Sequence, residues 1–259
     1  LWQGDRDVNP AVHRTLGDAY LGQGRADAGV RQYEFALQIA PDDRLTQIGY
    51  GAALRAAQRP EDAMEIFDRL AEELPDNPIP VVQIAETQLA QGEVEAAKET
   101  LRRAMSMTDE PGGIEQRYAG VLLQTGDPEG AVEVFRTMIE RDGANPARLA
   151  SLAAAQRAAG DAAAAVRTLE EGVRDYADDP SSFTRLALFL REQGDLRQGL
   201  EVAEEGLVNH PDDLTLLRIA ATMARDADEL DAAVRYGERI LQQNPDGVDD
   251  RFIYATLLD

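Results

Sequence analysis

The chain has 259 residues, of which 48 are acidic and 26 basic, so its formal net charge is −22. A surface this acidic argues against general affinity for nucleic acid or anionic lipid, because both require cationic side chains. The chain has no cysteine, which excludes disulfide bonds and thiolate chemistry. It also has no run of about 18 apolar residues, so we expect no direct membrane insertion.

The stretch from Leu16 to Pro41 recurs every 34 residues up to the C-terminus, with no insertion or deletion. A first column contains only small residues: Gly17, Gly51, Ala85, Ala119, Ala153, Ala187, Ala221 and Ala255. A second column is equally small: Gly29, Ala63, Ala97, Ala131, Ala165, Gly199 and Ala233. A third is mostly glycine: Gly24, Gln58, Gly92, Gly126, Gly160, Gly194 and Asp228. A period of 34 residues is the length of a helix–turn–helix repeat.

Each repeat is therefore expected to fold as two antiparallel helices. In the first repeat, Val12, Leu16 and Tyr20 have the spacing of an amphipathic helix, and Gly24 marks its end. The second helix buries an apolar stripe made of Val30, Tyr33, Ala36 and Leu37. It ends before the turn Pro41-Asp42-Asp43. Acidic residues are expected to cap several second helices: Asp127, Asp161 and Asp195.

These columns resemble the tetratricopeptide repeat (TPR) family over nearly the whole chain. The resemblance implies an all-α fold: an α-solenoid of about 7.5 units with the 34-residue period, stacked into a right-handed superhelix as a single array over residues 1–259. The units begin near Pro10, Arg44, Pro78, Gly112, Pro146, Pro180 and Leu214. A half-unit occupies 248–259, and residues 1–9 are the end of a preceding unit or an N-terminal cap. We therefore expect this chain to be a piece of a longer protein.

No group of residues points to catalysis, so we predict a non-enzymatic protein without metal or cofactor. His13 and His210 have no ligand partner at metal-binding spacing, and no serine has the surroundings of a nucleophile. The Asp-rich turns at residues 41–43 and 211–213 lack the alternating ligands of a calcium loop. Helix capping is the interpretation we favour for them.

The resemblance implies that the first helices line a concave groove. Its exposed stripe follows the columns that begin at Ala11, Arg14, Thr15, Asp18 and Leu21. Its basic residues are Arg14, Arg55, Arg117, Arg157, Arg185, Arg191, Arg218 and Arg225. Only Asp18 and Glu86 are acidic, so we predict a groove for an acidic or carboxylate-bearing segment. The alternative is that these arginines pair with acids on neighbouring helices, such as Glu192 or Asp226.

The main functional prediction is a protein-interaction scaffold that binds a partner peptide or protein in this groove. The Lys and Asn pair that some family members use to grip a C-terminal carboxylate is absent, because Lys98 lies on a second helix. One alternative is a structural scaffold of a bacterial envelope or secretion assembly, for example in polysaccharide export. Another is the regulatory part of a larger enzyme. We expect a soluble protein of the bacterial cytoplasm or periplasm, with the compartment left open.

The last half-unit offers a second possible interface. It carries several apolar residues that no following helix in this sequence covers: Phe252, Ile253, Tyr254, Leu257 and Leu258. An exposed apolar face of this kind favours association with another molecule. We therefore predict possible self-association through this C-terminal segment.

Overall fold

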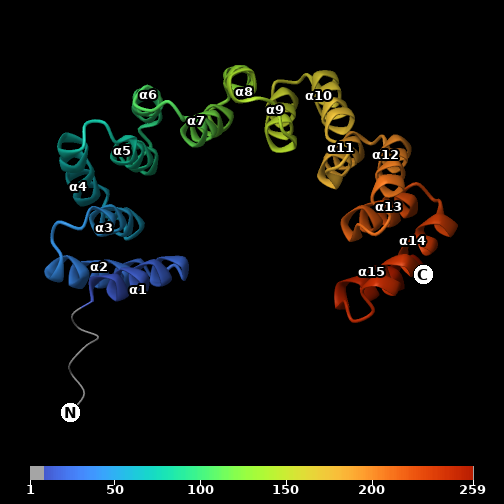
Figure 1. The fold of residues 1–259 in the computed structure, drawn as a ribbon, viewed down its shortest axis with the longest axis horizontal. Coiled ribbons are helices and arrows are strands. Elements are labelled where there is room, and N and C mark those ends of the chain that lie inside the picture. Colours follow the sequence, from blue (N-terminus) through green and yellow to red (C-terminus); the bar gives the residue numbers. More distant parts are fainter. Residues whose placement is uncertain (1–8, 259) are drawn as a thin grey trace, which may run out of the picture. The chain divides into compact units, whose positions relative to one another are not determined.

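The computed structural model describes residues 9–258, which form fifteen α-helices and no strand in that range (Figure 1). The first helices of the repeats are α1 (Pro10–Gly22), α3 (Arg44–Ala56), α5 (Pro78–Ala90), α7 (Gly112–Gln124), α9 (Pro146–Ala158), α11 (Pro180–Gln193), α13 (Leu214–Asp226) and α15 (Val248–Leu258). The second helices are α2 (Ala26–Ile39), α4 (Pro60–Glu73), α6 (Val94–Met105), α8 (Pro128–Asp142), α10 (Ala162–Asp175), α12 (Leu196–Asn209) and α14 (Leu230–Gln243). The all-α solenoid and its 34-residue period are confirmed.

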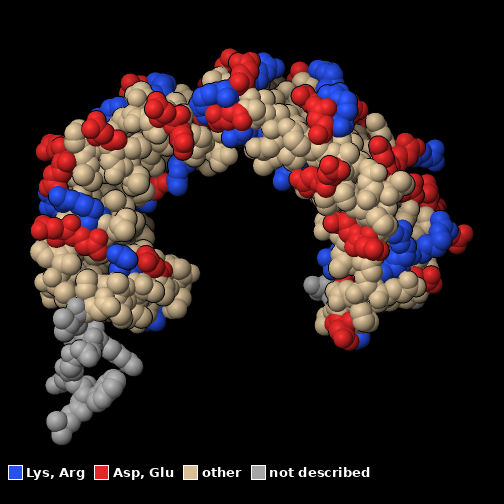
Figure 2. Space-filling view, viewed as in Figure 1, with Lys and Arg blue, Asp and Glu red and all other residues tan. Residues whose placement is uncertain are grey.

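The chain divides into two compact units, which meet between Val121 and Leu122 within α7. Unit 1 comprises the residues up to Val121, and unit 2 those from Leu122 onward. Within each unit, consecutive helices pack against each other, and successive first helices also touch, as α1 does with α3 and α11 with α13. Acidic and basic side chains are intermixed over the face shown in Figure 2. The single array over residues 1–259 stays a prediction.

The two small columns lie where the helices of a repeat approach each other most closely. A Cβ atom added to Gly29 would lie 3.3 Å from the carbonyl oxygen of Gly17, and one added to Gly199 would lie 3.0 Å from that of Ala187. The alanines at these places from Ala63 to Ala233 are almost completely buried. Larger side chains would force the two helices apart, so the prediction that small residues allow close packing is confirmed.

Aromatic side chains fill the space beside the first column in the N-terminal repeats. Tyr33 and Phe67 are fully buried, and a Cβ atom on Gly51 would lie 2.5 Å from the ring of Phe67. Glycine in the first column therefore makes room for the ring of the same repeat. Both aromatic residues belong to a buried cluster of unit 1 that joins α2, α3, α4 and Ile84 of α5.

The turn between the two helices of each repeat uses one left-handed residue. Gly24, Gly92, Gly126, Gly160 and Gly194 have φ between 71° and 88°, as expected for this glycine column. The two repeats without glycine keep the conformation: Gln58 has φ of 60° and Asp228 has φ of 64°. A left-handed conformation is unfavourable for a residue with a side chain, so tertiary packing imposes this turn on both repeats.

Polar side chains cap most first helices, which is the role favoured for the Asp-rich turns. Asp43 accepts a bond from the backbone N–H of Leu45 at 3.2 Å, and Asp213 accepts one from Leu216 at 2.8 Å. The remaining capping residues of first helices are Asn9, Asn77, Asn145 and Asp179. These bonds satisfy amide groups that have no partner inside the helix.

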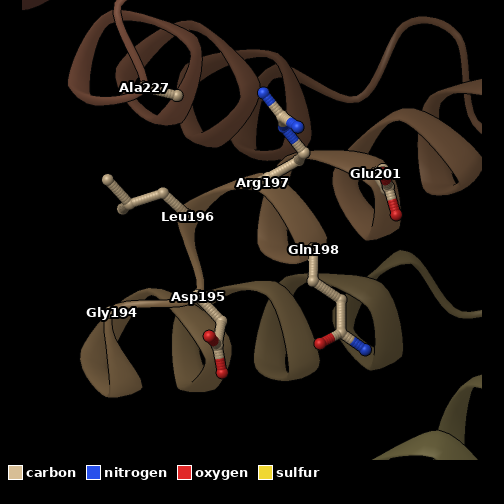
Figure 3. Close-up of a pocket in the computed structure, with 7 residues that line it drawn as sticks. All are labelled: Gly194, Asp195, Leu196, Arg197, Gln198, Glu201 and Ala227. Atoms are coloured by element: carbon tan, nitrogen blue, oxygen red, sulfur yellow. The ribbon is translucent and has the colours of Figure 1, made fainter.

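The predicted caps of the second helices are correct in two of three cases. Asp127 accepts a bond from the amide of Gly130 at 2.9 Å, and Asp161 accepts one from Ala164 at 2.8 Å. Asp195 stands at the capping position of α12 but makes no such bond, so this prediction is wrong. Its carboxylate points away from the start of α12 in Figure 3, which leaves the first turn without a side-chain acceptor.

Candidate protein-interaction surface

The eight arginines of the predicted stripe all lie on first helices, and seven of them are paired with carboxylates of this chain. In unit 1, Arg14 of α1 donates to Asp43 at the start of α3, with 3.1 Å between the guanidinium nitrogen and the carboxylate oxygen. Arg55 of α3 donates to Glu86 of α5 at 2.7 Å, and Arg117 of α7 pairs with the same carboxylate. Glu86 thus joins three successive first helices.

Unit 2 repeats this arrangement along α9, α11, α13 and α15. Arg157 pairs with Glu192, while Arg191 and Arg225 share the carboxylate of Asp226 at 3.1 and 2.9 Å. The last contact of this kind is made by Arg218 and Asp250. We call these contacts in both units the arginine–carboxylate ladder.

Asp250 is the most buried carboxylate of the ladder. Asp250 of α15 is 1% exposed and accepts two bonds from Arg218, at 2.6 and 2.8 Å, and one from Asn244 at 2.8 Å. The bonds from Arg218 hold the pKa of this carboxyl below its ordinary value. The charged form of Asp250 therefore attaches the last described helix to α13.

The ladder agrees with the alternative prediction for the stripe, in which the stripe arginines pair with acids of neighbouring helices, such as Glu192 and Asp226. Arg185 of α11 is different: within residues 9–258, no hydrogen bond or ion pair engages its exposed guanidinium. An incoming carboxylate can bind Arg185 without displacing an internal one. Partner binding by the stripe as a whole stays a prediction.

Exposed apolar side chains also lie on the first-helix face of unit 1. The distribution of charged residues along the stripe did not predict them. A cleft of about 310 Å³ lies between α5 and α7, and its apolar wall is formed by Pro78, Ile79, Val82 and Ile114. Arg117 and Glu110 are its charged lining residues. Ile79 is 49% exposed, and Leu45, at the equivalent place on α3, is 65% exposed. The sequence did contain a signal for this apolar surface: the solvent-facing column that begins at Ala11 has leucine at 45 and isoleucine at 79.

Unit 2 has a smaller cleft between α9 and α11, with a volume of about 200 Å³. Its floor is apolar and consists of Ala150, Ala153, Ala154, Leu169, Leu188 and Phe189. Arg157, Arg185 and Glu192 form its charged rim. The cleft thus combines an apolar floor with Arg185, the stripe arginine that no carboxylate in the described part of the chain neutralises.

A larger cavity of about 620 Å³ beside the turn from α11 to α12 is a consequence of the repeat. Figure 3 shows Arg197 pointing towards α13, whose C-cap is Ala227, and Asp195 pointing the opposite way. A cavity of about 410 Å³ lies at the equivalent place around Gly24 and Arg25 in the first repeat. Because the cavity recurs at the same turn of different repeats, it is a general feature of the repeat fold, and we assign no ligand to it.

Among the described residues 9–258, no three His, Asp or Glu side chains gather where they could hold a metal ion. The longest helix there, α8, has 15 residues, and none of the helices combines the length and hydropathy of a membrane span. The side chains of Phe252, Ile253, Leu257 and Leu258 lie outside the described residues, so self-association through this segment stays a prediction.

The fold and repeat pattern agree with comparisons to known proteins. Two profiles of the tetratricopeptide repeat match the sequence, one over residues 54–111 and 122–187 and the other over residues 14–78 and 184–248. No curated protein gives a significant match.

Among solved structures, a tetratricopeptide repeat protein from Parabacteroides merdae ATCC 43184 is 11% identical, with a TM-score of 0.52 over 96% of this chain and 99% of that chain. MamA is 18% identical, with a TM-score of 0.47 over 64% of this chain and 90% of that chain. These likenesses concern the fold, whereas the profiles concern the sequence itself. The chain belongs to the tetratricopeptide repeat family.

Proposed function

We propose that the chain is a non-enzymatic interaction scaffold that binds a partner polypeptide on its first-helix face. The observation that carries this proposal is the cleft between α9 and α11, where an apolar floor meets the free guanidinium of Arg185. Burial of an apolar side chain supplies affinity, and a charge-assisted bond to Arg185 supplies orientation. The partner segment we expect therefore has an aliphatic or aromatic residue close to an Asp or Glu.

The paired arginines have a different part in this proposal. A partner carboxylate that approaches Arg157 or Arg191 must compete with Glu192 or Asp226, which are already in place. Exchanging one exposed ion pair for another changes the free energy little, because such pairs contribute about 0–1 kcal/mol. These paired arginines therefore add little to the binding of an acidic partner, and Arg185 is the main contact for an acid.

Selection from a random peptide library displayed on phage, with the whole chain as bait, tests this proposal. We expect the enriched sequences to share an apolar residue near an acidic one. Arg185→Glu should weaken their binding about 10-fold or more, equivalent to about 1.4 kcal/mol. Arg174→Glu is the matched control, because Arg174 is exposed on a second helix and is paired with the neighbouring Asp175.

A second variant tests the wider stripe. Changing Arg157, Arg191 and Arg225 together to Glu removes three paired cations from the first-helix face of unit 2. Circular dichroism must first show unchanged helicity. If the selected peptides carry no acid and bind Arg185→Glu and the triple variant as well as wild type, the first-helix face does not recognise acidic segments. The proposal would then be wrong in its choice of ligand.

A further inference from the structure

The start of unit 1 carries apolar side chains that no described residue covers. Val12 and Leu16 of α1 are 39% and 43% exposed, and Phe35 and Ile39 of α2 are 48% and 37% exposed. Figure 2 shows mostly uncharged side chains over α1 and α2, at the lower left of the view. We call these four residues the N-terminal apolar face. It lies apart from the clefts of the first-helix face.

The part of this face on α1 belongs to the surface by which repeats stack. Later repeats bury the residues equivalent to Val12, such as Thr46 and Leu216, each 0% exposed. The preceding second helix covers them: a Cβ atom on Gly206 of α12 would lie 3.0 Å from Leu216 of α13. Val12 and Leu16 are thus shaped to receive another helix.

The part on α2 has a different origin. The residues equivalent to Phe35 are polar in every later repeat: Arg69, Arg103, Thr137, Glu171, Glu205 and Arg239. Most of them remain exposed although a repeat precedes them, so repeat stacking does not explain the exposed ring of Phe35. His13 joins the two parts, because its ring lies 5.6 Å from that of Phe35 and its Nδ1 is 3.0 Å from Gln32.

Beyond Asp27 in its first turn, the outer surface of α2 lacks exposed acidic side chains. Its exposed positions at helical spacing are Arg31, Phe35, Gln38 and Ile39, whereas the equivalent positions of α4 are Glu65, Arg69, Glu72 and Glu73. Two copies of a chain with a net charge of −22 repel each other over most of their surface. The N-terminal apolar face is a place where two copies approach without opposed carboxylates.

We propose that the N-terminal apolar face binds the same face of a second copy of the chain across a two-fold axis. Such an isologous contact brings Phe35 and Ile39 of one α2 against their counterparts and continues the stacking surface of α1. The face is small compared with standard interfaces, which have about 20–30 residues on each side. We therefore expect a weak dimer, with a Kd on the order of tens of micromolar.

Sedimentation equilibrium of the whole chain, over a range of concentrations, tests the proposal. Wild type should change from monomer to dimer, and the double variant Phe35→Glu/Ile39→Glu should weaken association at least 10-fold. Val208→Glu is the matched control, because Val208 is an 81% exposed apolar residue on the second helix α12. A chain that stays monomeric into the hundreds of micromolar, or a dimer that the double variant leaves intact, overturns the proposal.

Disulfide trapping tests the geometry independently, because the chain has no cysteine of its own. Gln38 lies on α2 beside Phe35 and Ile39, so Gln38→Cys should form a covalent dimer under mild oxidation much faster than Val208→Cys. Equal rates for the two variants count against the proposed contact. If dimerisation appears only after residues 1–8 are removed, the chain's own N-terminal segment is the occupant and the proposal is overturned.

Discussion

Replacing Gly51 by alanine tests how the small columns accommodate the aromatic core of unit 1. Gly51 is buried within α3, and its missing Cβ would lie 2.5 Å from Cζ and 2.6 Å from Cε1 of Phe67. Phe67 is 0% exposed, so its ring is enclosed by the core and cannot swing out into solvent without opening it. Alanine occupies the same column in the third and later repeats, where the residue equivalent to Phe67 is in most cases smaller, as Leu101 is.

Two opposing effects determine the size of the change. Overpacking a close-packed core costs about 1–3 kcal/mol. Alanine in place of glycine in a helix interior recovers about 1 kcal/mol through its higher helix propensity. The net destabilisation of Gly51→Ala should therefore be about 1 kcal/mol. Phe67→Leu alone leaves unfilled space and should cost about 1–2 kcal/mol.

The double variant Gly51→Ala/Phe67→Leu recreates the alanine–leucine pair that Ala85 and Leu101 form in the third repeat. We expect it to be at least about 1 kcal/mol more stable than the sum of the two single changes predicts. Native-state hydrogen exchange of α3 and α4 is the suitable assay, because the repeats of a solenoid need not unfold together.

Gly120 provides the matched control for Gly51. Gly120→Ala lies within a first helix and meets no neighbouring atom within 4 Å, so it should raise stability by up to about 1 kcal/mol. If Gly51→Ala is equally stabilising, the ring of Phe67 does not restrict the first column. If the two changes at Gly51 and Phe67 are additive, the sizes of the two columns are not matched to each other.

Three further changes have defined outcomes. Gln58→Gly should stabilise unit 1 by about 0.5–1 kcal/mol in urea unfolding, since it relieves a left-handed residue, whereas Gln23→Gly, at a negative φ, should not. Ala131→Leu should destabilise by about 1–3 kcal/mol, because Ala131 is 0% exposed; an unchanged melting temperature would contradict this. The pKa of Asp250 is lowered in the folded state, so the charged carboxylate stabilises the fold. Its contribution to the free energy of unfolding is complete above about pH 4 and is lost as the pH falls further. Urea midpoints at several pH values should show this loss, and Arg218→Gln should reduce it.

The repeat period made the fold predictable almost to the residue. The observed first helices begin at Pro10, Arg44 and Pro78, and so on to Val248, where the 34-residue register places them. This accuracy has a physical origin, because each repeat supplies an independent copy of the same packing constraints. Seven copies of the turn position all adopt positive φ, including Gln58 and Asp228, where single-residue preference points elsewhere.

The site was harder to predict, because it depends on contacts between repeats. Glu192 and Asp226 lie one column beyond the predicted arginine stripe, yet they form ion pairs with Arg157 and Arg191 of the preceding first helix. Asp250 lies in a column that is buried in most other repeats, so nothing local in the sequence marks it as the partner of Arg218. Pairing across a distance of 31 to 35 residues follows from the stacking of helices and not from spacing along one helix.

The ladder changes how partner recognition by this face should be understood. Its arginines contribute little net attraction for an acid, because each is already neutralised by a neighbour, but their removal would leave Glu86, Glu192 or Asp226 unpaired. Affinity must come from apolar area, at about 25 cal/mol per Å² buried, which the clefts beside Ile79 and Phe189 offer. Arg185 is the position of the stripe where an unpaired charge and apolar contact coincide.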